Sequence, residues 1–100
     1  MTVSISPELA AYMARRHRRI LSVEVASADH SDIEVTELYV RLVRDDFADY
    51  LVDRKHYRRV PAGEYEVLLP NYRLHYDEEL RFGLKSFWFF HHITLEGVRL

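Results

Sequence analysis

The sequence contains no cysteine. Without thiols the chain cannot form disulfides, carry out thiolate catalysis, build zinc fingers or ligate an iron-sulfur cluster through sulfur. Glycine and proline are scarce too, with three of each in 100 residues, which argues against disordered or low-complexity segments. No apolar stretch approaches the ~20 residues of a membrane helix, and no signal-peptide pattern is present at the start. We therefore expect a cytoplasmic protein with no membrane partner.

The length and composition of the chain limit the folds that it can adopt. One hundred residues allow one domain, residues 1–100, and a chain of this size can bury a core without disulfides or metals. Hydrophobic residues make up 48% of the chain and charged residues 30%, which is typical of a globular domain. The formal net charge of -2 means that a nucleic acid would need a local basic patch. Nucleic-acid binding is not expected.

Local patterns predict one N-terminal helix. Ser6 followed by Pro7 is typical of a helix start, because the serine side chain caps the first turn and proline has no N–H to satisfy there. Leu9, Tyr12 and Met13 then share one helical face, so one stripe should be buried. Apolar residues spaced two apart predict strands before and after this helix. The expected strands lie at 2–5, 20–25, 35–44, 57–60, 64–69, 79–85 and 93–100.

Two segments are expected to be irregular. Residues 26–34 lack apolar alternation and are rich in Ser and Asp, which favours a loop. Residues 47–55 have helical spacing over few turns, which indicates a turn of helix or an ordered loop. The sequence therefore predicts an α+β, sheet-dominated fold in which one N-terminal helix packs on a mixed or antiparallel sheet of six or seven short strands.

An aromatic run follows the strand at 79–85. Phe87, Trp88, Phe89 and Phe90 exceed what one face of one strand can bury, because neighbouring residues alternate sides. If the strand continues without a bulge, Trp88 and Phe90 lie on the core face of Leu80. Phe87 and Phe89 then lie on the opposite face. We expect Trp88 and Phe90 to be core aromatics, and Phe87 and Phe89 to form an interface with a second copy or a protein partner.

Several residue strings resemble the HesB-like or A-type iron-sulfur carrier domain. The opening V-S-I-S-P-E-L-A-A-Y-M resembles that family's short strand and alanine-rich helix. The strings G-E-Y-E-V-L-L-P, E-L-R-F-G-L-K-S-F-W-F-F and I-T-L-E-G-V-R-L resemble its small branch that carries paired cysteine or selenocysteine. The resemblance covers most of the chain and implies a single HesB-like domain.

The chemistry of that family does not transfer. Where the small branch has its cysteine pair, this chain has Ala28, Asp29 and His30, and the terminal Cys-x-Cys of the true carriers has no counterpart. We therefore expect no iron-sulfur cluster and no resident cofactor. No nucleophile elbow or other catalytic motif is present, so no catalytic residue is assigned and an enzyme is not the favoured interpretation.

Three function classes follow. The favoured one is a cysteine-less HesB-like domain that acts as a non-enzymatic interaction or assembly module. The alternative is a small protein that binds a divalent metal through Asp29, His30 and Asp32, because imidazole and carboxylate are competent ligands. A weaker alternative is a small-molecule or anion site lined by Tyr and Arg. The basic clusters at 15–19 and 54–59 are expected to be charge-mixed surface.

Overall fold

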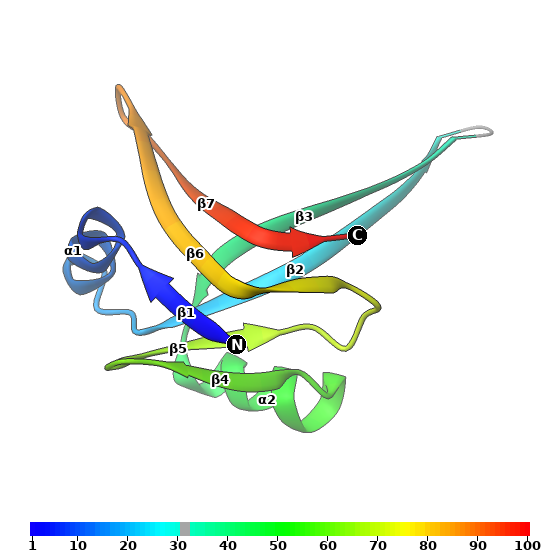
Figure 1. Cartoon of the computed structure of the whole chain (residues 1–100), viewed down its shortest axis with the longest axis horizontal. Coiled ribbons are helices and arrows are strands. Elements are labelled where there is room, and N and C mark those ends of the chain that lie inside the picture. Colours follow the sequence, from blue (N-terminus) through cyan, green and yellow to red (C-terminus); the bar gives the residue numbers. More distant parts are fainter. Residues whose placement is uncertain (31–32) are drawn as a thin grey trace.

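The computed structural model of the chain describes residues 1–30 and 33–100, and the side chains outside 27–36. Figure 1 shows the described elements, two helices and seven strands. They run in the order β1 (Thr2–Ile5), α1 (Pro7–Arg15), β2 (Ile20–His30), β3 (Ile33–Val43), α2 (Asp45–Lys55), β4 (Arg58–Ala62), β5 (Tyr65–Leu69), β6 (His75–Phe87) and β7 (Phe90–Arg99). The sheet-dominated α+β class is confirmed.

The strands form two mixed sheets. One sheet has three strands in the order β1-β6-β7, and the other has four in the order β3-β2-β5-β4. The pairs β1 with β6 and β2 with β5 are parallel, whereas the remaining pairs are antiparallel. Consequently β3 and β7 each lie at the edge of a sheet.

The core has two parts because β2 is buried on both faces. Leu21 and Val23 point into the main core, which also receives side chains from β5, β6 and α1. Ile20 points the other way and packs against α2, where Ala48 and Leu51 complete a smaller cluster. The alternation of side chains along a strand gives β2 these two contacts.

Helix α1 begins as the sequence predicts. The Ser6 side chain accepts a hydrogen bond of 3.2 Å from the Leu9 backbone N–H, and Pro7 occupies the first helical position. Leu9 and Met13 are completely buried in the main core. Local capping chemistry and one apolar stripe were therefore sufficient to predict this helix.

Helix α2 corrects the expectation of a single helix. Residues 45–55 form 11 residues of regular helix, not one turn or a loop. The helix begins at Asp45 and Asp46 and ends near Arg54 and Lys55, so acidic and basic residues complement its dipole at both ends. His56 closes the helix in the left-handed conformation, with φ of 59°.

The loop predicted at 26–34 is also wrong. The backbones of β2 and β3 remain paired as far as the His30 and Ile33 partners, so both strands run through most of that segment. The two strands therefore form a long hairpin. Ladder hydrogen bonds join backbone groups and need no apolar alternation, which is why the composition of this segment was misleading.

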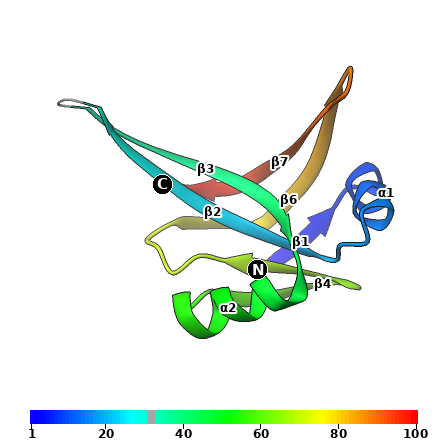
Figure 2. The same cartoon turned by 180° about the vertical axis from the view of Figure 1, so that it is seen from behind.

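Two hairpins extend away from the body of the molecule in diverging directions (Figures 1 and 2). We call the β2–β3 hairpin the first arm and the β6–β7 hairpin the second arm. Helix α1 lies beside the second arm, and α2 lies at the opposite end of the molecule. Neither of these two helices of the described chain has the length and apolar character to cross a bilayer.

Candidate functional site: an aromatic hairpin tip

The second arm ends in a two-residue turn. Phe87 and Phe90 are the last paired residues of β6 and β7, so Trp88 and Phe89 connect the strands. Trp88 adopts a left-handed backbone conformation with φ of 57°. Such turns normally use Asn or Gly at positions of positive φ, and a bulky residue there is strained. Local strain of this kind is typical of functional positions.

All four aromatic side chains at this turn face solvent. Phe87 is 73% exposed, Trp88 79%, Phe89 88% and Phe90 75%. We call these four residues the aromatic tip. Since a large aromatic side chain carries roughly 200 Å² of surface, the tip presents about 600 Å² of apolar area. That equals the largest patch on a typical monomer, and such patches mark interaction sites.

The expectation that Trp88 and Phe90 are core aromatics is wrong in this structure. Leu80 and Phe82 on the same strand are buried as the alternation predicts, with 0% and 2% exposure. The second arm then extends beyond the body that covers this face, and the strand ends before Trp88. The interface assignment of Phe87 and Phe89 remains a prediction, and their exposure is compatible with it.

Helix α1 supports the base of the aromatic tip. The Tyr12 ring lies 4.9 Å from the His91 ring, measured between centroids, and the guanidinium of Arg16 lies 5.0 Å from the Tyr12 ring. The Ser86 hydroxyl and His91 Nδ1 are 2.9 Å apart across the arm. These contacts hold the arm against the body while the tip projects from it. Among the described contacts no carboxylate lies against the His91 ring.

A groove lies between the two edge strands. It encloses about 170 Å³ and is lined by Leu38, Tyr39 and Val40 of β3 and by His92, Ile93, Leu95 and Val98 of β7. Its apolar side chains are half-buried, apart from Tyr39, which is 44% exposed. We call it the edge groove. Most of the residue types that line it are apolar, but polar atoms contribute to its surface as well.

A larger pocket lies where α2 begins. It encloses about 400 Å³ between the segment that follows α1 and the β3–α2 corner, and Arg18, Arg19 and Arg44 contribute to its lining. Two carboxylates reduce the positive charge of this pocket. Nη2 of Arg19 lies 3.7 Å from Oδ2 of Asp45, and Nε of Arg44 lies 3.9 Å from Oδ1 of Asp46.

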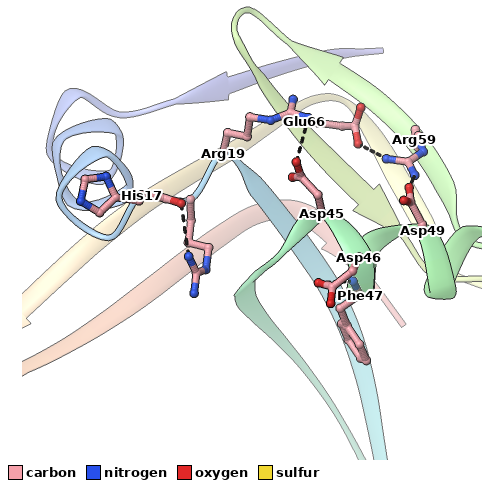
Figure 3. Close-up of polar contacts among 9 residues, drawn as sticks. His17, Arg19, Asp45, Asp46, Phe47, Asp49, Arg59 and Glu66 are labelled. Atoms are coloured by element: carbon pink, nitrogen blue, oxygen red, sulfur yellow. Dashed lines mark hydrogen bonds and ion pairs between the residues drawn. The ribbon is translucent and has the colours of Figure 1, made fainter.

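Those two carboxylates also stand in the first turn of α2. An anion attracted by the helix dipole would bind at that position. Nearby, the guanidinium of Arg59 forms ion pairs with Asp49, at 2.6 Å, and with Glu66 (Figure 3). The positive charge of this residue of the 54–59 cluster is therefore compensated. The pocket where α2 begins thus offers less positive charge than its arginines suggest.

The side chains proposed as metal ligands lie outside the described part of the structure. Asp29 and His30 lie near the distal end of β2, and Asp32 lies outside the described residues. The side chains of Asp29 and His30 likewise fall outside the described part. Within the part of the chain whose side chains are described, no group of three His, Asp or Glu residues is placed to hold a metal ion.

A buried polar network was missed by the sequence analysis. Glu24 on β2 is only 7% exposed, and its carboxylate accepts hydrogen bonds from Ser22 Oγ at 2.6 Å and Tyr57 Oη at 2.9 Å. Arg41 Nε lies 3.5 Å from Glu24 Oε1. Burial, and then the hydrogen bond to Glu24, raise the pKa of Tyr57 well above its ordinary value.

This network supports the fold and offers no chemistry to a substrate. The Glu24 carboxylate is satisfied on both oxygens, and Arg41 is further engaged with the Phe47 ring at 4.6 Å. A buried charge that is fully paired is common in structural roles. The sequence signal was the alternation itself, which placed Ser22 and Glu24 together on the face opposite Leu21.

Comparison with protein-family models found no matching family, and comparison with curated proteins found no relative.

Proposed function

We propose that this chain is a non-enzymatic interaction module that self-associates through its aromatic tip. The observation that carries the proposal is the exposure of four consecutive aromatic side chains at the end of a regular hairpin. A domain with a complete core elsewhere has no folding reason to expose them, whereas a second copy of the chain could bury them.

The size of the tip supports this role. Burial of about 600 Å² of apolar surface is worth roughly 15 kcal/mol at 25 cal per Å². Association costs ~4 to 15 kcal/mol in lost translational and rotational freedom. One tip therefore matches the upper end of that cost, and burial of two tips exceeds it. A homodimer supplies two tips.

The resemblance to HesB-like domains fits this proposal in one respect. A domain of that family without cysteines loses the thiolate ligands of a cluster and retains its surface for contacts with other proteins. We therefore propose a HesB-like interaction domain that carries no iron-sulfur cluster.

Sedimentation velocity over a wide range of protein concentration tests the proposal. Wild-type protein should shift from monomer to dimer as concentration rises, and the double variant Phe87→Ser/Phe89→Ser should remain monomeric. Tyr72→Ser is the matched control, because Tyr72 is an exposed aromatic residue, 49% accessible, outside the tip. It should dimerise like the wild type.

Circular dichroism should show folded protein in every case. A wild-type protein that stays monomeric at the highest attainable concentration would contradict the proposal. A dimer that persists in the tip variant would contradict it as well.

A further inference from the structure

The aromatic tip has cationic side chains at its base, on both faces of the second arm. On one face, Lys85 pairs across the ladder with His92, and both side chains are exposed. Side chains alternate along a strand, so the next pair toward the tip, Ser86 and His91, lies on the other face. Helix α1 packs against this second face, because the Tyr12 ring lies against His91. The charges of the two faces therefore come from different elements.

Helix α1 supplies the cations of the second face. The guanidinium carbons of Arg15 and Arg16 lie 6.0 Å and 5.0 Å from the centre of the Tyr12 ring. Lys85, Arg15 and Arg16 are all exposed, and none of the three forms an ion pair with a carboxylate among the described residues. We call these three residues the basic collar. Two segments far apart in the sequence thus bring positive charge to the base of the tip.

The acidic residues of the second arm lie away from the tip. They belong to its proximal part: Asp77, Glu78, Glu79 and Glu96. Two of them form ion pairs with Arg81 and Arg99, and four residues of strand, roughly 13 Å, separate Arg81 from Lys85. On α1, Glu8 precedes Arg15 by seven residues, roughly 10 Å along the helix. Because charges are screened over about 8 Å at physiological ionic strength, these carboxylates scarcely reduce the positive potential of the collar.

The aromatic tip extends beyond the basic collar by a length that suits a lipid interface. Phe87 follows Lys85 by two residues and Trp88 follows it by three, so the rings stand roughly 7 to 10 Å further along the arm. Elements that lie in a membrane interface bury their apolar side chains by about 5 to 10 Å. At that depth the collar would be level with the lipid headgroups, and tryptophan is enriched at this boundary.

We propose that the aromatic tip and the basic collar together bind an anionic lipid surface. The four rings enter the interface, while Arg15, Arg16 and Lys85 contact the headgroup phosphates. The expectation of no membrane partner rested on the lack of a spanning segment, which a peripheral contact does not need. The inference goes beyond the proposed self-association and does not depend on it. Because either contact buries the tip, a dimer and a lipid-bound monomer exclude each other.

Charge decides which contact prevails when both partners are present. In a dimer joined tip to tip, the two collars approach one another with like charge, which opposes association. An anionic leaflet presents the opposite charge, and each Lys or Arg near it strengthens binding. Anionic lipid in excess should therefore dissociate the dimer.

The shape of the molecule also suits a flat partner. The two arms diverge, so a surface placed across the end of the second arm stays clear of the first arm (Figures 1 and 2). A single-stranded nucleic acid would meet similar chemistry, since its bases stack on aromatic rings and its phosphates attract cations. Proteins that bind it combine these features in a groove that follows the backbone. Here the rings occupy a projecting end, with the cations behind them.

Trp88 provides the measurement, because it is the single tryptophan and is 79% exposed. Dilute protein is titrated with vesicles of phosphatidylserine and phosphatidylcholine, and separately with vesicles of phosphatidylcholine alone. The anionic vesicles should shift the Trp88 emission to shorter wavelength and carry the protein with them on flotation. Neutral vesicles should bind at least ~tenfold more weakly, since they do not attract the three cations. High salt should weaken the binding to anionic vesicles.

Matched substitutions separate the basic collar from the overall charge of the protein. Arg15→Gln/Arg16→Gln removes two charges of the collar and should weaken binding to anionic vesicles at least ~tenfold. Arg54→Gln/Lys55→Gln removes the same charge from the exposed end of α2, at the opposite end of the molecule, and should bind within about twofold of the wild type. Phe89→Ser removes the most exposed ring of the tip, at 88%, and should also weaken binding. Circular dichroism checks that each variant is folded.

The dimer gives a second readout. At a protein concentration at which sedimentation shows a dimer, anionic vesicles should bind the protein and lower the yield of chemically cross-linked dimer. Neutral vesicles should leave that yield unchanged. A cross-linked dimer that binds anionic vesicles as well as the free protein does would overturn the inference, because its tips are already buried.

The outcomes distinguish this inference from self-association. If the wild type ignores anionic vesicles, or binds neutral vesicles equally well, the inference is overturned, whatever sedimentation shows of the dimer. Binding that Arg15→Gln/Arg16→Gln leaves unchanged overturns it too, because the collar then has no role. A Trp88 response to a single-stranded oligonucleotide and not to vesicles would assign the tip to nucleic acid instead. A wild type that is monomeric in solution yet binds anionic vesicles would end the proposed self-association and leave this inference standing.

Discussion

The Tyr57 hydroxyl donates a hydrogen bond of 2.9 Å to Oε2 of Glu24, across 33 residues of sequence. Tyr57 lies between α2 and β4, and Glu24 lies on β2 under α2, so this bond ties the second helix to the centre of the four-stranded sheet. A hydrogen bond to a buried carboxylate is stronger than one between neutral groups.

Loss of this hydrogen bond should lower the free energy of unfolding. We expect Tyr57→Phe to cost about 2 kcal/mol, because the hydroxyl is removed while the carboxylate stays buried. Tyr72→Phe is the control, since Tyr72 is 49% exposed, and it should change stability by less than ~0.5 kcal/mol. Urea unfolding followed by circular dichroism measures both. Equal stability of the two variants would show that the bond contributes nothing.

The same pair should make stability depend on alkaline pH. The pKa of Tyr57 is raised above the value of 10.0 that it has when unfolded. Above that pH the unfolded chain releases the phenolic proton while the folded chain retains it, so deprotonation favours unfolding. The stability that Tyr57 contributes through its raised pKa is complete below pH 10.0 and is lost as the pH rises further.

Wild-type protein should therefore lose stability more steeply than Tyr57→Phe as the pH rises from about 10 to about 11. Tyr76, whose pKa is also raised by burial, is present in both proteins and contributes equally to both curves. Urea midpoints measured across this range test the difference. Parallel pH profiles for the two proteins would refute the assignment.

Gly97 should not tolerate a side chain. Its φ is 99°, and a Cβ atom built there would overlap the backbone oxygen of Glu79. Gly63 also has a positive φ, of 63°, but a Cβ there meets nothing within 4 Å. Gly63→Ala should cost ~1 kcal/mol from backbone strain, and Gly97→Ala should cost at least ~2 kcal/mol because the strand must also move. Thermal unfolding of both variants decides whether the close approach matters.

Substitutions in the aromatic tip should spare the monomer. Trp88→Asn should leave the free energy of unfolding unchanged or raise it slightly, because Asn tolerates the left-handed conformation at φ of 57°. Phe82→Ala, 2% exposed on the same strand, should instead cost ~3 to 5 kcal/mol. Both are measured on dilute protein. A large loss in Trp88→Asn would mean that the tip contributes to folding of the monomer.

The metal alternative makes a separate prediction. If Asp29, His30 and Asp32 bound an ion, zinc or manganese would raise the melting temperature by mass action, and His30→Ala would abolish the rise. We expect the melting temperature to be unchanged by either ion in both proteins. A rise in the wild type alone would favour the metal-binding function over self-association.

Elements with local signals were predictable from sequence. Ser6 and Pro7 mark the start of α1, and Gly63 marks the turn of the β4–β5 hairpin, where a positive φ suits glycine. The sequence of α2 also carries signals for a helix. Its acidic first turn at Asp45 and basic last turn at Lys55 match the helix dipole, although its buried stripe contains only Ala48 and Leu51.

Features that depend on where the core ends were not predictable. The alternation that buries Leu80 and Phe82 continues in register toward Phe90, and nothing in the sequence says that the covering layer stops first. The edge groove depends on two strands from different sheets lying together, Leu38 on one and Leu95 on the other. Tertiary arrangement of this kind leaves no periodic trace.

Trp88 has a practical consequence for work on this protein. It is the single tryptophan of the chain and already faces solvent in the folded monomer, so unfolding brings little change to the surroundings of its indole ring. A denaturation curve followed by tryptophan emission would be nearly flat and would resemble that of a protein with no cooperative structure. The same indole becomes a clean optical reporter of association, because contact with another molecule is what can move it out of water.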